Sequence, residues 1–173
     1  MLRRTLNAAG YRAYGWGQPF NNTISEARMA AAENTLAALH RTHGQKVIVI
    51  GWSLGGFYAR VLARRRPEAC AMVVTLGTPF SGDRHANNAW RLYELLNNHP
   101  VDSPPIADDP AIKPPVCTIA VWSPNDGVIA PAGARGLPSE RDRAVEVPFR
   151  HFELGSSRRA AQRIAALVSE YSA

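Results

Sequence analysis

The sequence predicts an α/β fold built on a mainly parallel sheet of about five strands with helices on both faces. Short apolar runs alternate along the chain with stretches of helical periodicity. The apolar runs are continuous rather than alternating, which is typical of parallel strands covered on both sides by helices. At 173 residues the chain fits one domain, residues 1–173, and can bury about two-thirds of its unfolded surface.

Helical segments are predicted where apolar residues recur every three or four positions and a helix-ending residue follows. Gly10 and Gly44 each end one such pattern, and Pro67 limits another. The predicted helices are 2–9, 25–43, 54–65, 90–96 and 156–171. The predicted strands are the short apolar runs between them, namely 11–16, 47–50, 71–76, 116–122 and 144–147.

A proline-rich stretch interrupts this alternation. Six prolines fall between residues 97 and 115, and no convincing element can be assigned there. Because a structureless connection of this length is uncommon in a compact domain, residues 80–115 are interpreted as a lid-like excursion.

The most informative stretch is Gly51-Trp52-Ser53-Leu54-Gly55, which lies between a predicted strand and a predicted helix. This is the G-x-S-x-G pattern of a nucleophile elbow, in the strand–turn–helix context that the pattern requires. A sharp turn lifts the serine clear of the sheet, and its close packing tolerates only small residues two positions before and after. Ser53 is therefore the candidate nucleophile. A phosphate-binding turn is the competing interpretation.

The string VIGWSLGGFYARVLA, followed by Thr75-Leu76-Gly77-Thr78-Pro79, resembles the bacterial lipase and esterase branch of the α/β-hydrolase superfamily. The resemblance extends over most of the chain and is strongest at residues 46–80 and 116–160. It implies a serine hydrolase that cleaves carboxylic esters, with the catalytic residues in the order serine, acid, histidine.

This order selects Asp126, which follows the strand 116–122, and His151, which precedes the last predicted helix. Asp83 is the competing acid. His40 and His43 end a helix on the wrong side of the sheet. His85 and His99 flank the lid-like excursion and are interpreted as surface residues.

The implied mechanism is the serine–histidine–aspartate triad with an acyl-enzyme intermediate. The Leu54 N–H would be one oxyanion donor, while Trp52 and Phe80 are the candidate substrate-binding residues. Two alternatives stay open: a catalytically weak or inactive binding module of the same fold, and an acyltransferase. The substrate would be a small-molecule or lipid ester, and no cofactor or metal is implied.

The N-terminal part of the family pattern has no counterpart in this sequence. The family places a strand and a loop that donates to the oxyanion before the helix matched by residues 2–9, and this chain begins after them. One strand is also missing between 11–16 and the elbow strand. We therefore expect residues 11–16 to pair directly with residues 46–50 in a five-stranded sheet. Gly15 or Gly17 would be a substitute oxyanion donor.

The composition favours a globular protein rather than a nucleic-acid-binding one. The net charge of +6 comes almost entirely from scattered arginines. Their one run, Arg64–Arg66, falls at a predicted helix end, where cations are favourable. Two cysteines make no disulfide framework, and no segment could span a membrane. We expect a cytoplasmic protein, and homodimer formation is compatible with the sequence. Three explanations of the shortened N-terminus stay open: a truncated gene product, a wrongly chosen start and a naturally reduced hydrolase.

Overall fold

The sheet contains four parallel strands in the order β1-β2-β3-β4. The computed structural model describes residues 1–17, 24–82 and 106–172. The strands are β1 (Val47–Trp52), β2 (Cys70–Leu76), β3 (Cys117–Trp122) and β4 (Arg143–Glu146). The predicted α/β architecture with a parallel sheet is thus confirmed, with four strands in the described residues rather than five.

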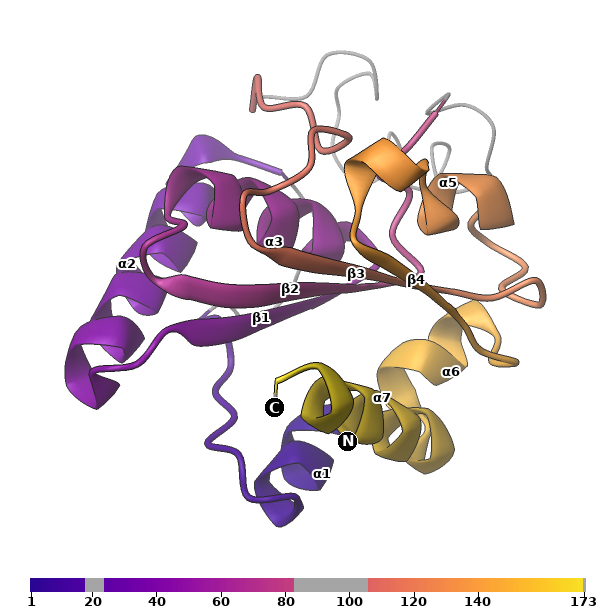
Figure 1. Cartoon of the computed structure of the whole chain (residues 1–173), viewed down its shortest axis with the longest axis horizontal. Helices are drawn as coiled ribbons and strands as arrows, with labels where there is room; N and C mark the ends of the chain where they lie inside the picture. The colour runs from indigo at the N-terminus through magenta and orange to yellow at the C-terminus, as the bar shows by residue number, and fades with distance from the viewer. Residues whose placement is uncertain (18–23, 83–105, 173) are drawn as a thin grey trace.

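Helices cover both faces of the sheet (Figure 1). One face carries α2 (Glu26–His43) and α3 (Leu54–Arg65). The opposite face carries α1 (Leu2–Ala8), α6 (His151–Ser156) and α7 (Arg158–Tyr171). The connection between β3 and β4 contains two short helices, α5 (Pro131–Arg135) and the 3-10 helix η1 (Pro138–Glu140). The described part of the chain has no helix both long and apolar enough to cross a bilayer.

The helices begin and end where the sequence supplies caps. The Ser25 hydroxyl accepts from the Arg28 N–H at the start of α2, and Gly44 closes this helix in the left-handed conformation. At α7 the Ser157 hydroxyl accepts from the Ala160 N–H. The apolar face of α7 is then buried against the sheet, led by Ile164, Leu167 and Val168.

The predicted strand at residues 11–16 is wrong. This segment forms no strand, and within the described residues no backbone hydrogen bond joins it to residues 46–50. Tyr11 packs against the apolar cluster on the α7 face, whereas Trp16 packs against the cluster on the α2 face. Residues 11–16 therefore pass from one face of the sheet to the other without pairing with β1.

Two further predictions fall partly or wholly beyond the described residues. The helix expected at 90–96 lies outside them, as do residues 83–105 of the lid-like excursion. Of the rest of the excursion, Ile106 is fully buried in the cluster between α2 and α3.

The arginine run at the end of α3 is engaged by carboxylates within the chain. Arg65 bridges Glu26 and Glu33 of α2 to Asp108, at N–O distances between 2.6 and 3.2 Å. Arg66 pairs with Glu68 at 2.6 Å. These ion pairs tie the C-terminal end of α3 to α2 and to the segment that precedes β3.

Arg60 of α3 is fully buried and holds two connecting segments together. Its guanidinium donates to the backbone carbonyls of Pro110, Ala111 and Glu140. The Phe80 ring lies flat against it, 3.9 Å from Cζ to the ring centroid. Burial lowers the pKa of Arg60 to about 10, so the side chain keeps its charge at neutral pH.

We predict that Arg60→Leu lowers the free energy of unfolding by about 3 kcal/mol or more, because three carbonyls lose their donor together. Urea unfolding followed by circular dichroism would measure this. Arg64→Leu is the matched control. Arg64 donates one hydrogen bond to the Asp109 carbonyl and forms a 3.9 Å ion pair with Asp108 near the surface. Its loss should lower the free energy of unfolding by less than about 1 kcal/mol. Equal losses in the two variants would contradict the buried role.

Candidate active site

Ser53 lies in a strained turn between β1 and α3. Its backbone has φ 52° and ψ −125°, and among the described residues it is the one non-glycine with a positive φ. Gly51 makes the turn sterically feasible, since a Cβ at that position would lie 2.2 Å from the Gly55 carbonyl oxygen. The sequence therefore folds into the elbow that the G-x-S-x-G pattern predicts.

Two hydrogen bonds from β2 and the residues after it support this strained turn. The Ser53 N–H donates to the Leu76 carbonyl at 2.9 Å. The buried Thr78 hydroxyl donates to the Ser53 carbonyl, also at 2.9 Å. The Gly-Thr-Pro segment was evident in the sequence as a motif, but its contact with the elbow was not. Thr78 is thus a supporting residue that the sequence reasoning missed.

The structure brings Ser53, Asp126 and His151 together. The His151 Nε2 atom is 3.1 Å from the Ser53 Oγ atom, and the His151 Nδ1 atom is 3.0 Å from Asp126 Oδ2. Asp126 and His151 are both buried, whereas Ser53 is half-exposed. His151 is the first residue of the short helix α6, which precedes the final helix α7.

Asp126 is fixed by both of its oxygens. Oδ1 accepts hydrogen bonds from the N–H groups of Val128 and Ile129, at 3.0 and 2.7 Å, which leaves Oδ2 for His151. Gly77, with φ +54°, packs against this contact. A Cβ at this position would be 2.8 Å from Asp126 Oδ2 and 3.2 Å from His151 Nδ1. The turn after β3 and the turn after β2 therefore both shape the Asp126–His151 pair.

The N-terminus of α3 supplies the candidate oxyanion donor. Leu54 is the first residue of this helix, and its N–H donates to no group in the described residues. Gly15 lies beside Arg3 of α1, and Gly17 lies beside Thr35 of α2. These contacts involve helices, and the role of either glycine as a substitute oxyanion donor stays a prediction.

The two aromatic residues predicted to bind substrate have different surroundings. Trp52 is partly exposed and lies against the His151 ring, with ring centroids 5.4 Å apart. Phe80 is buried and contacts Arg60 and the Gly136 backbone, and its role in substrate binding stays a prediction. Phe152 was not singled out from the sequence, yet its ring is 65% exposed and contacts His151 and Trp52.

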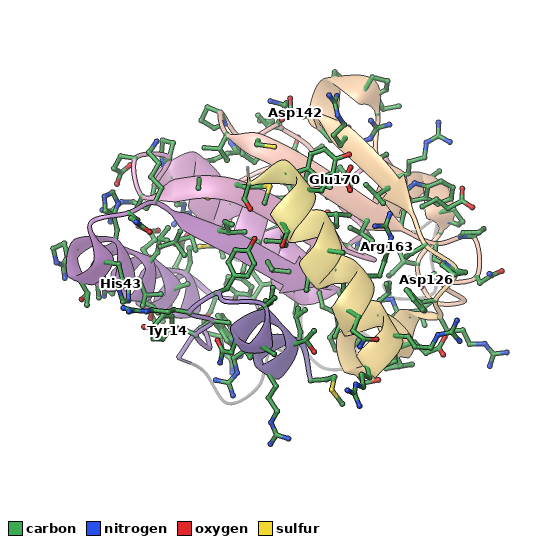
Figure 2. All side chains as sticks on the ribbon, turned by 60° about the horizontal axis from the view of Figure 1, so that its bottom comes forward. Tyr14, His43, Asp126, Asp142, Arg163 and Glu170 are labelled. Atoms are coloured by element: carbon green, nitrogen blue, oxygen red, sulfur yellow. The ribbon has the colours of Figure 1, made fainter. Side chains whose placement is uncertain are left out.

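Of the competing residues, the structure describes the histidines at the end of α2. His43 bonds to the Tyr14 hydroxyl at 3.0 Å, and this pair lies at the opposite end of the molecule from Asp126 (Figure 2). Asp83, His85 and His99 lie outside the described residues. Within the described residues no three His, Cys, Asp or Glu side chains are grouped to hold a metal ion. A groove of about 430 Å³ at β4, lined by Trp122 and Arg135 among others, includes none of the three candidate catalytic residues.

The alpha/beta hydrolase fold family matches residues 11–100, which is just over half of the chain. The chain therefore belongs to this family. A search of curated proteins gave no match.

Solved structures agree with the family assignment. A lipase-esterase related protein from Clostridium acetobutylicum is 13% identical, with a TM-score of 0.66 over 98% of this chain and 88% of that one. A monoacylglycerol lipase from Paleococcus ferrophilus is 15% identical, with a TM-score of 0.63 over 98% and 86%. A pyrethroid hydrolase from Sphingobium faniae is 14% identical, with a TM-score of 0.64 over 99% and 90%. At such identities the likeness is one of fold, and together with the family it supports a hydrolase.

We predict that Thr78→Val lowers the free energy of unfolding by about 1–2 kcal/mol, because the Ser53 carbonyl loses a buried donor while the side-chain shape is kept. Chemical denaturation would measure the loss. Thr75→Val is the matched control, since Thr75 is equally buried but its hydroxyl makes only a 3.4 Å contact with the Ile119 carbonyl. A larger loss in the control would contradict a special role for Thr78.

Proposed function

We propose that this chain is a serine hydrolase that cleaves carboxylic esters through an acyl-enzyme. The observation that carries the proposal is the pair of contacts at His151, with Ser53 Oγ on one ring nitrogen and Asp126 Oδ2 on the other. A carboxylate only accepts hydrogen bonds, so Nδ1 carries the proton toward Asp126. In the neutral ring Nε2 is then free to accept the proton of the Ser53 hydroxyl.

The proposed reaction follows from this geometry. His151 Nε2 removes the hydroxyl proton as Ser53 Oγ attacks the ester carbonyl, and Asp126 stabilises the imidazolium that forms. The developing oxyanion would lie at the N-terminus of α3, where the Leu54 N–H and the positive end of the helix favour negative charge. His151 then protonates the leaving alcohol. Water, activated by the same ring, releases the acid from Ser53.

The substrate class rests on two further observations. The structural neighbours include a lipase-esterase related protein and a monoacylglycerol lipase. The exposed Phe152 and the partly exposed Trp52 place apolar rings beside His151. Both favour an ester with an apolar acyl or alcohol group.

A binding module of the same fold is the second candidate function. It is favoured by the oxyanion site, where Leu54 at the start of α3 is the one candidate donor that we identify at the elbow among the described residues. The absence of one donor typically lowers the turnover number by about a hundredfold to a thousandfold. A chain with only one donor could bind an ester and turn it over slowly or not at all.

We predict that Ser53→Ala abolishes hydrolysis of a short p-nitrophenyl ester without unfolding the chain, because only one half-exposed hydroxyl is lost. Release of p-nitrophenol would be followed by absorbance, and circular dichroism would check the fold. Full activity in the variant would rule out Ser53 as the nucleophile. A wild-type chain that releases product no faster than buffer would favour the binding module instead.

We predict that Asp126→Asn lowers kcat by about four orders of magnitude. Oδ1 accepts two backbone N–H groups, so the amide oxygen must take this place and the NH₂ group must face His151. Nδ1 then has to accept, which moves the ring proton to Nε2 and prevents this atom from taking the Ser53 proton. Asp142→Asn is a control for a carboxylate that also caps a backbone N–H but lies at β4. A comparable loss of kcat there would contradict the assignment of Asp126.

A further inference from the structure

Trp52 makes a contact that its predicted role as a substrate-binding residue does not explain. Its indole Nε1–H donates a hydrogen bond to the backbone carbonyl of His151, at 3.0 Å. The same side chain lies against the imidazole, with ring centroids 5.4 Å apart and an interplanar angle of 37°. One residue of β1 thus holds both the backbone and the ring of the candidate base.

The other hydrogen bonds of His151 are mainly to Asp126, in the turn after β3. Its N–H donates to the Asp126 carbonyl at 2.9 Å, and its Nδ1 bonds to Asp126 Oδ2. Both bonds tie His151 to the turn after β3 rather than to the elbow. Within the described residues, the elbow is hydrogen-bonded to His151 through two groups, the Ser53 hydroxyl and the Trp52 indole.

These two bonds differ in what the proposed reaction does to them. The Ser53–His151 bond must break and re-form as the proton moves and Oγ attacks the substrate. The Trp52–His151 bond joins a neutral N–H to a backbone carbonyl and takes no part in proton transfer. Because Trp52 immediately precedes Ser53, this second bond can hold His151 at a constant distance from Ser53 throughout the catalytic cycle.

The indole is itself held in place. Its ring packs against Gly155 of α6 so closely that a Cβ there would lie 2.8 Å from the Trp52 ring. The Phe152 ring meets the indole edge-on, with centroids 6.2 Å apart. The side chain therefore has little freedom to shift toward α6, although 37% of its surface is exposed.

We propose that Trp52 is a positioning residue that sets the distance between His151 and Ser53 through its indole N–H. The inference rests on the proposed hydrolase function and assigns no direct contact with substrate. Misplacement of a reacting group by about 1 Å can cost a hundredfold in rate, so one such hydrogen bond can matter for catalysis.

The test is Trp52→Phe, which keeps an aromatic ring and removes the N–H donor. A fluorophosphonate probe would first titrate the fraction of chains whose Ser53 reacts, and kcat would then be expressed per titrated site. We expect kcat per site to fall about ten- to a hundredfold, with KM within about twofold of the wild type. Gly155→Ala, which keeps the indole but displaces it, should lower kcat per site in the same way.

Trp122→Phe is the matched control, because the Trp122 ring contacts Arg135 in the groove at β4 rather than His151. Its kcat per site should stay within about twofold of the wild type. An unchanged kcat per site in Trp52→Phe, with or without a smaller titratable fraction, would overturn the inference, and so would a rise in KM alone. A wild type that neither titrates nor turns over would instead overturn the proposed function, and this inference with it.

Discussion

The candidate site depends on one backbone conformation, the positive φ of Ser53. Holding a non-glycine residue in a sparsely populated region of φ and ψ typically costs about 1–3 kcal/mol, and the surroundings must offset this cost. Here the supports are specific: Gly51 allows close packing, and the Ser53 backbone bonds to Leu76 and to the Thr78 hydroxyl on either side. The strain raises the hydroxyl above the end of β1 and starts α3 at Leu54, so nucleophile and candidate oxyanion donor are set by the same turn.

The parallel sheet brings the other members of the site to this turn. The carboxyl ends of parallel strands meet at one edge of the sheet, which is where open α/β folds bind their ligands. Ser53 follows β1, Thr78 follows β2, Asp126 follows β3 and His151 follows β4. The turns also bond to the neighbouring strand or turn: the Gly77 N–H donates to Val121 of β3, and the His151 N–H donates to Asp126. The order of the four strands therefore determines how Ser53, Asp126 and His151 are brought together.

Much of this arrangement could be predicted from the sequence because its signals are local. The elbow needs small residues at fixed spacing around Ser53, and the family order then indicated Asp126 and His151. The strand expected at 11–16 failed because an extended pattern does not say whether a partner strand is within reach. The helices α5 and α6 were missed because five or six residues are too short to show helical periodicity. The Trp52–His151 bond joins residues 99 positions apart, so no local pattern could indicate it.

The central claim is that His151 and Asp126 activate the Ser53 hydroxyl, and covalent labelling tests it most directly. The wild-type chain and His151→Gln would be incubated with a fluorophosphonate at equal concentration, and mass spectrometry would locate and time the adduct. The account predicts a single adduct on Ser53 in the wild type, formed far faster than in His151→Gln, because the variant lacks the base. No adduct, an adduct on another residue, or equal labelling rates in the two chains would contradict it.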